Sequence, residues 1–225
     1  MTTRVGVVMF PGSNCEHDVV HAVSGLGASA EIVWHAATDV SAFDVVVLPG
    51  GFAHGDYLRA GALARFAPVM AAVADFAAAG GAVVGICNGF QVLTEAGLLP
   101  GALQKNARLR FLCEPAGLRV DSTRSVLTRS VPLGSELVLP INHFVGRFVC
   151  DDATLAELVA DERVVLRYTD NPNGSIDDIA GITSRAGNVV GLMPHPERAT
   201  DALVGGTDGA VLLASLLAMA GAAAV

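Results

Sequence analysis

Three residues of this 225-residue chain, a cysteine, a histidine and a glutamate, have the types and surroundings of a nucleophilic site. Cys87 stands in the run Gly-Ile-Cys-Asn-Gly (85–89), after an apolar stretch and before a predicted helix. In a nucleophile elbow, a sharp turn between strand and helix exposes the nucleophile in this way. Small flanking residues leave room for the turn, and the positive end of the helix favours the thiolate. A buried structural cysteine is the alternative.

The histidine and the glutamate lie in Met-Pro-His-Pro-Glu-Arg (193–198), where two prolines keep the chain extended. Residues two apart in an extended chain point to the same side, so Glu197 can hold one imidazole nitrogen of His195. An unassisted thiol has a pKa near ~8.5 and ionises little at neutral pH, so it benefits from a base. We predict Cys87 as nucleophile, His195 as base and Glu197 as the group that orients it. Metal ligation is the alternative for the pair, and we expect no metal site.

A third segment, Pro-Gly-Gly-Phe (49–52), follows the apolar run 44–48. Paired glycines let backbone N–H groups approach a ligand closely. Such donors stabilise the oxyanion that forms when a thiolate adds to an amide carbonyl. A phosphate-binding loop is the competing interpretation, but no Lys-Ser/Thr pair follows the glycines.

The elements that must position these segments alternate between strand and helix in the first half of the chain. Strands are predicted at 4–10, 30–34, 44–48 and 82–86, and helices at 13–25, 61–79 and through Gln91 and Leu93. Ser13 and Glu16 have the spacing of a capping box for the first helix. The alternation predicts an α/β fold: a flavodoxin-like, doubly wound, mostly parallel sheet with helices on both faces. In such sheets, sites form at the carboxyl ends of strands, where all three segments lie.

In the second half of the chain the alternation of strand and helix stops, and short apolar strands separated by turns are predicted instead. Strands are predicted at 108–113, 118–121, 137–141, 164–168, 179–183 and 189–193. We expect a mixed or antiparallel extension of the sheet, closed by an apolar helix over 210–225. That helix is shorter than the ~20 residues of a membrane span. No linker or repeat interrupts the sequence, which predicts one domain over 1–225.

Composition narrows the classes of function. The formal charge is −8 and no basic run occurs, which argues against nucleic-acid binding. The four cysteines match no zinc pattern, and the N-terminus leads directly into a strand rather than a signal peptide. We therefore expect a cytoplasmic protein that binds neither nucleic acid nor membranes. His17 and His21 could form a metal pair, but a solvated helix face is the favoured interpretation.

The Gly-x-Cys-x-Gly run with a later His-Pro-Glu resembles the class I, or triad, glutamine amidotransferases. Within them, the similarity is strongest to the glutaminase subunits of phosphoribosylformylglycinamidine synthases. It rests on FPGSNCEHD (10–18), PGGFAHGDYLRAGA (49–62), GICNGFQVL (85–93), NHFVGRF (142–148), NPNGS (171–175) and GLMPHPER (191–198). Other members usually have a bulky apolar residue where this chain has Asn88. His54 also departs from the family, in which many members have an aromatic residue there.

The resemblance implies one amidotransferase domain over 1–225, in which Cys87 attacks the side-chain amide of glutamine. A glutamyl thioester would form, and His195 would protonate the departing ammonia and then activate water. The backbone amides of Gly51 and Asn88 would form the oxyanion hole. Substrate glutamine would be held by Gly50, Phe52, Gln91, Asn142 and Phe144.

The resemblance also implies partners. A synthetase subunit would use the ammonia, with ATP and Mg²⁺, to convert formylglycinamide ribonucleotide, and a small subunit would bridge the two; this chain would hold no cofactor. We expect docking at a rim formed by 55–59, 171–175 and 197–198. The alternatives are a DJ-1/PfpI-type thiol hydrolase, a glutaminase subunit of another amidotransferase, and a non-catalytic regulatory subunit.

Overall fold

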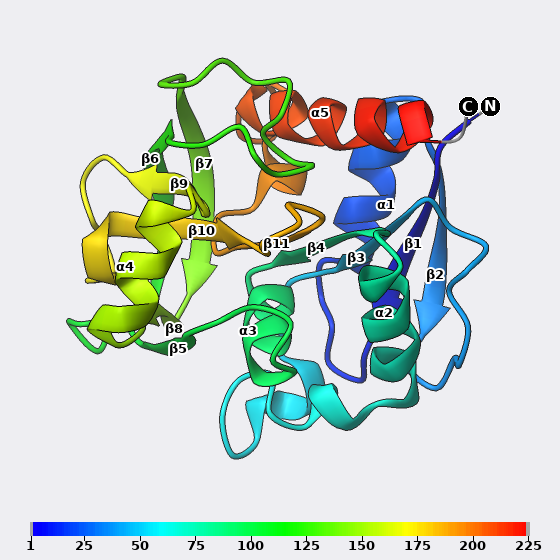
Figure 1. The fold of residues 1–225 in the computed structure, drawn as a ribbon, viewed down its shortest axis with the longest axis horizontal. Coiled ribbons are helices and arrows are strands. Elements are labelled where there is room, and N and C mark those ends of the chain that lie inside the picture. Colours follow the sequence, from blue (N-terminus) through cyan, green and yellow to red (C-terminus); the bar gives the residue numbers. More distant parts are fainter. Residues whose placement is uncertain (1, 224–225) are drawn as a thin grey trace.

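The parallel half of a large sheet positions the predicted catalytic segments (Figure 1). The computed structural model describes residues 2–223, and within them nine strands form one sheet of order β2-β1-β3-β4-β11-β10-β9-β6-β7. The first five in this order are parallel: β2 (Ser29–Trp34), β1 (Arg4–Met9), β3 (Val45–Leu48), β4 (Ala82–Ile86) and β11 (Val189–Leu192). The remaining four are antiparallel: β10 (Ile179–Thr183), β9 (Val164–Tyr168), β6 (Leu112–Val120) and β7 (Glu136–His143). The predicted parallel sheet with an antiparallel extension is confirmed.

Helices cover both faces of the parallel half. In Figure 1, α1 (Glu16–Gly25) and α5 (Asp208–Ala223) lie on one side, and α2 (Pro68–Ala78) and α3 (Asn88–Glu95) on the other. Strands β3, β4 and β11 are buried along their whole length, because helices pack on both of their faces. Their continuous Val, Leu and Ile runs are the expected composition of such strands. The core is therefore centred directly beneath the turn that carries Cys87.

The predicted capping box at Ser13 is wrong. Helix α1 begins at Glu16, and its N-cap residue Cys15 makes no side-chain cap. The Ser13 hydroxyl instead accepts a hydrogen bond from the Phe10 amide at 3.0 Å. The amides of Asn14 and Cys15 both donate to the Gly50 carbonyl at 3.2 Å. A tertiary contact with the glycine loop thus satisfies the amides that a local cap would have served.

The predicted continuous helix over 61–79 is also wrong. A short 3₁₀ turn at Ala64–Phe66 ends before α2 begins at Pro68. Ala67 between them is extended, with ψ of 141°, because a proline disfavours helical backbone in the residue before it. Phe66 consequently points outward and is 73% exposed.

The antiparallel half differs in detail from the sequence prediction. The predicted strands 108–113 and 118–121 are one strand, β6. Strands β5 (Ala102–Lys105) and β8 (Val145–Val149), which pair with each other, and helix α4 (Asp152–Ala160) were not predicted. The signal for α4 was present, because Asp151 caps it by accepting from the Thr154 amide at 2.7 Å. Strands β5 and β8 are only four and five residues long, so their sequences alone do not identify them.

The last helix, α5, overlaps the predicted range 210–225, of which residues 224 and 225 lie outside the described part of the chain. Among the described residues, no helix is both long and apolar enough to cross a membrane.

Helix α3 can approach the sheet closely because β11 has a glycine beneath it. A Cβ on Gly191 would lie 2.0 Å from the Phe90 ring. We predict that Gly191→Ala lowers the free energy of unfolding by about 1–3 kcal/mol, the usual cost of overpacking a core. Urea denaturation followed by circular dichroism measures this.

The matched control is Gly25→Ala at the end of α1, where an added Cβ meets nothing within 4 Å. Its effect should stay within about 1 kcal/mol. Equal stability of Gly191→Ala and wild type would contradict the packing argument.

Candidate active site

Cys87 occupies the turn between β4 and α3 with φ of 52° and ψ of −103°. A positive φ is unfavourable for a residue with a side chain, and such strain persists only where neighbours impose it. Here the Cys87 amide donates to the Leu192 carbonyl at 2.8 Å. Gly89 is required two residues later, since a Cβ there would lie 1.9 Å from the Leu48 carbonyl oxygen. The structure thus has the geometry of a nucleophile elbow.

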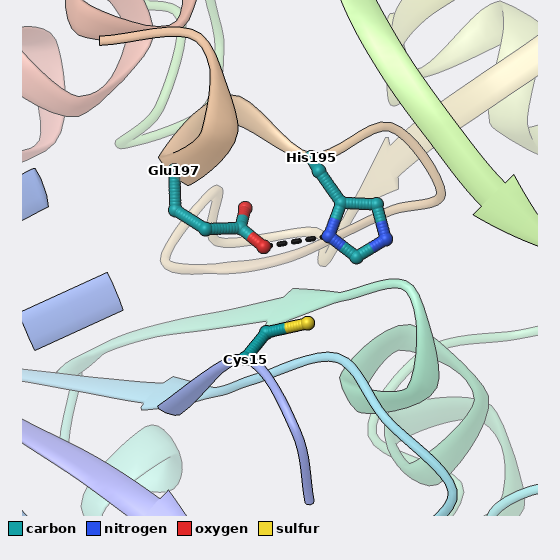
Figure 2. Close-up of side chains that lie close together, drawn as sticks. All are labelled: Cys15, His195 and Glu197. Carbon is teal, nitrogen blue, oxygen red and sulfur yellow. Dashed lines mark hydrogen bonds and ion pairs between the residues drawn. The ribbon is translucent and has the colours of Figure 1, made fainter. Parts of the chain in front are cut away.

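His195 and Glu197 form a buried pair. His195 Nδ1 and Glu197 Oε1 are 2.6 Å apart, and both side chains are nearly inaccessible to solvent (Figure 2). The His195 amide donates to the Pro140 carbonyl at 2.8 Å, which anchors the segment to β7. Gly50 packs flat against the ring, since a Cβ there would lie 2.7 Å from His195 Cε1. The orientation of the imidazole is therefore fixed by the Glu197 carboxylate, by the backbone hydrogen bond of His195 and by contact with Gly50.

The electrostatics of His195 suit a base beside a thiol. Burial opposes the charged ring, but the Glu197 carboxylate, followed by the Cys87 sulfur, outweighs it and holds the pKa of His195 well above its ordinary value. The Nε2 atom is buried and has no hydrogen-bond partner within residues 2–223. With Nδ1 held by Glu197, Nε2 is the nitrogen left to exchange a proton with a reacting group.

A second thiol, that of Cys15, lies beside the His195–Glu197 pair. The ligand atoms of Cys15, His195 and Glu197 all lie within 4.8 Å of one another (Figure 2). Such a set could bind a soft metal ion. However, His195 Nδ1 and Glu197 Oε1 already satisfy each other, so the absence of a metal site stays a prediction. The only sequence signal for Cys15 was its place in the stretch 10–18.

The backbone amides of Gly51 and Asn88 make no hydrogen bond within the described part of the chain. The Gly50 carbonyl accepts from Asn14 and Cys15, and the Gly51 N–H of the same trans peptide points in the opposite direction. Gly51 has φ of 140°, and a Cβ there would lie 2.6 Å from the Asn14 nitrogen, so only glycine fits. The amide of Asn88 is the first of helix α3, where donors are left unpaired. Both amides are available to an oxyanion.

A cavity of about 820 Å³ opens over these groups. Of the predicted site residues, its wall includes Cys87, His195, Gly51, Phe52, Gln91, Asn142 and Phe144. Gly50, Asn88 and Glu197 are buried and support that wall from behind. The structure therefore brings all the predicted site residues into one region of the fold.

Gln91 lines the cavity but is largely engaged by the protein itself. Its Oε1 accepts from Asn88 Nδ2 at 2.7 Å, and its Nε2 donates to the Val145 carbonyl. One N–H and one lone pair remain for a substrate. Gln91 therefore joins the helix of the nucleophile to the opposite wall of the cavity.

The NPNGS segment has a structural role that the sequence analysis missed. Asn171 Oδ1 accepts from the amides of Gly174 and Ser175, which closes the turn. Asn173 Nδ2 donates to the Gly146 carbonyl at 2.9 Å, and the Phe148 amide donates to Ser175 Oγ at 3.0 Å. Asn173 and Ser175 are buried, so this turn braces β8 against the cavity. These two residues cannot form part of an exposed docking rim.

The sequence analysis placed Arg59 and Arg198 in the predicted rim but missed two further cations of the cavity, Lys105 and Arg147. Besides the predicted residues, the wall includes the basic side chains of Arg59, Lys105, Arg147 and Arg198, and that of His143. Lys105 Nζ lies 5.8 Å from the centre of the Phe144 ring. These residues come from separate segments, so only the folded chain shows that they face one volume.

Comparison with known proteins agrees with this geometry. The family model described as a CobB/CobQ-like glutamine amidotransferase domain matches residues 2–206. The chain belongs to this family. As an amidotransferase it is similar to "Phosphoribosylformylglycinamidine synthase subunit PurQ" of Parasynechococcus marenigrum, with 58% identity over 95% of this chain and 99% of the relative. The protein of the same name from Lacticaseibacillus paracasei is 54% identical over 95% and 94% of the two chains.

Solved structures place this amidotransferase in the same group. A chain in the "Structure of PurLQS from Thermotoga maritima" matches with a TM-score of 0.90 and 40% identity, covering 97% of this chain and 99% of that one. The structure of another glutamine amidotransferase from Thermotoga maritima has a TM-score of 0.57 at 16% identity, covering 89% and 78% of the two chains, which shows the shared fold alone. The alternative of a DJ-1/PfpI-type hydrolase is set aside by the family match.

His143 of the amidotransferase is buried and neutral. Asn106 Nδ2 donates to two carbonyls, so its Oδ1 must accept from His143 Nδ1 at 3.1 Å. Burial, with help from His195, lowers the pKa of His143 to about 4. Its neutral form therefore stabilises the fold above pH 6.5, and this contribution is lost as pH falls toward 4.

We predict that His143→Asn, which keeps a donor near Nδ1, flattens this pH dependence. Relative to the variant, wild type should lose on the order of 3 kcal/mol of unfolding free energy between pH 6.5 and 4. Urea denaturation at several pH values measures the difference. Parallel profiles for the two proteins would show that His143 is not the titrating group.

Proposed function

We propose that this chain is the glutaminase subunit of a phosphoribosylformylglycinamidine synthase. It hydrolyses glutamine to glutamate and ammonia, and a synthetase subunit uses the ammonia with ATP to convert formylglycinamide ribonucleotide. The observation that carries the proposal is the buried His195–Glu197 pair facing the same cavity as the strained Cys87 turn. Relatives above 50% identity with this named function, aligned over nearly the whole chain, support the choice of acceptor.

The geometry accounts for each step of glutamine hydrolysis. The Cys87 thiolate, stabilised by imidazolium and by the start of α3, adds to the side-chain amide carbon. The amides of Gly51 and Asn88 hold the oxyanion, and His195 passes its proton to the departing nitrogen. Ammonia leaves and a glutamyl thioester remains. His195, now neutral, takes a proton from water, which attacks the thioester carbon. The C–S bond breaks, glutamate leaves, and the thiolate and imidazolium are regenerated.

Glu197 has a supporting role in this mechanism. A single carboxylate oxygen on Nδ1 fixes the tautomer that presents Nε2 to the thiol and stabilises the imidazolium. Because the pair is fully buried, water cannot compete for either group. We propose Glu197 as the orienting member of the triad rather than a proton carrier.

The partners follow from the same relatives. The Thermotoga maritima structure is described as PurLQS, and we propose that this chain likewise assembles with a synthetase and a small subunit. ATP and Mg²⁺ would be held by the synthetase, because this sequence lacks a phosphate-binding loop. The cavity mouth carries exposed apolar side chains suited to a partner: Phe52, Leu58, Leu109 and Phe111. All four cysteines are free, in keeping with a reducing cytoplasm.

Cys87→Ala tests the nucleophile. In the complex with synthetase, small subunit, ATP and acceptor nucleotide, the variant should lose glutamine-dependent product formation by at least about 10⁴-fold, as removal of a nucleophile does. Product formation from added ammonium salt should remain, since the synthetase only needs ammonia. Normal glutamine-dependent turnover by the variant would exclude Cys87 as nucleophile.

Glu197→Gln tests the orienting role. The variant should form the glutamyl thioester more slowly than wild type but faster than His195→Ala, because the base is kept while its tautomer is no longer fixed. The double variant should resemble His195→Ala alone, since the members of a triad act as a unit. Single-turnover rapid-quench measurement of the thioester provides the rates. Strictly additive losses would show that the two residues act separately.

A further inference from the structure

The side chain of Asn88 makes contacts that its proposed backbone role does not require. Asn88 Oδ1 accepts from the Ala53 amide at 3.0 Å. Its Nδ2 donates both to Asp56 Oδ1 at 3.1 Å and to Gln91 Oε1 at 2.7 Å. The side chain is 2% exposed, so water does not satisfy these atoms. The residue directly after the nucleophile thus holds the segment that follows the glycine loop.

That segment, 52–58, is strained and is weakly supported on its outer side. His54, Asp56 and Leu58 have φ of 53°, 52° and 68°, values that side chains rarely adopt. Its outer residues Tyr57 and Leu58 are 73% and 86% exposed. Strained backbone persists only where the surroundings impose it. On the inner side of the segment, two of the hydrogen bonds that hold this strained backbone come from Asn88.

These hydrogen bonds lie close to the proposed oxyanion hole. Ala53, whose amide Asn88 holds, is two residues after Gly51. The amides of Gly51 and Asn88 are the two proposed oxyanion donors, and neither makes a hydrogen bond within the described part of the chain. The Ala53–Asn88 bond therefore joins the residue that supplies one proposed donor to a residue two positions after the other.

We propose that the Asn88 side chain is a positioning residue, which sets the separation of the two oxyanion donors by tying segment 52–58 to the first turn of α3. This rests on the proposed glutaminase function. Asp56 completes the tie by accepting from Asn88 Nδ2. A bulky apolar residue at position 88 could make none of these bonds, so the segment and the helix would be free to separate.

The effect should fall on the transition state. Thiolate formation depends on His195 and α3, and glutamine binding depends on the cavity wall, so neither requires the spacing of the two amides. Stabilisation of the oxyanion does require it, because a donor displaced from the oxyanion loses most of its contribution. Loss of the hydrogen bonds between Asn88 and segment 52–58 should therefore lower kcat, leave the KM for glutamine nearly unchanged and spare the intrinsic reactivity of Cys87.

The experiment uses Asn88→Asp, which keeps an acceptor for Ala53 but places a carboxylate against Asp56 Oδ1 and Gln91 Oε1. In the complex with synthetase, small subunit, ATP and acceptor nucleotide, we expect kcat for glutamate release to fall about 10–100-fold, less than the loss of a donor costs. KM should change less than about 2-fold. Alkylation of Cys87 by iodoacetamide, followed by mass spectrometry of its peptide, needs no oxyanion hole. The new carboxylate beside Cys87 disfavours the thiolate, but the alkylation rate should fall much less than kcat.

The decisive variant combines two reciprocal substitutions. Asn88→Asp combined with Asp56→Asn restores an amide donor opposite a carboxylate, and kcat should recover to within about 5-fold of wild type. Asp75→Asn, on the exposed surface of α2, is the matched control and should be neutral. Unaltered kcat in Asn88→Asp, no recovery in the double variant, or alkylation that falls in parallel with kcat would each overturn the proposal. A wild-type complex that releases no glutamate would instead refute the glutaminase function itself.

Discussion

The backbone at Cys87 is the constraint on which the rest of the site depends. Its positive φ turns the chain abruptly from β4 into α3, and this is possible only because glycines allow the helix to lie directly on the sheet. One geometric choice therefore fixes three things together: the exposure of the sulfur, the direction of the helix dipole and the position of the first helical amide. The buried His195–Glu197 pair is then brought to the sulfur by β11, the parallel neighbour of β4.

The loops around this turn are held by hydrogen bonds between segments far apart in sequence, rather than by local structure. The glycine loop at 50–51 is bound by the amides of Asn14 and Cys15, and segment 52–58 by Asn88. Gln91 extends the same network to the wall formed by β8. Each loop is thus supported by a residue of another loop, which explains how strained backbone persists at the mouth of an open cavity.

The sequence predicted most of the sheet because buried parallel strands leave a strong signal. The runs at β3 and β4 are continuous and apolar. It predicted which residues meet at the candidate site because glycines and prolines at Cys87 and His195 constrain the backbone in recognisable ways. The sequence failed to predict structure where tertiary contacts replaced local ones. At Ser13, for example, the hydroxyl accepts a hydrogen bond from the Phe10 amide and does not cap the helix. The sequence also could not place Cys15, because nothing local to that residue shows that it will lie beside His195.

The division of the sheet into a parallel and an antiparallel half separates two tasks. The turn that carries the nucleophile and the glycine loop come from the parallel half, and His195 and Glu197 follow its strand β11. The facing wall, with Asn142, His143 and Phe144, comes from β7 at the antiparallel edge and the residue after it. One backbone bond, from His195 to the Pro140 carbonyl, connects the reacting groups to that wall. The two halves are therefore modular: the edge strands could be exchanged to admit a different amide while the reacting groups stay in place, which makes this edge the natural region for redesigning the nitrogen donor.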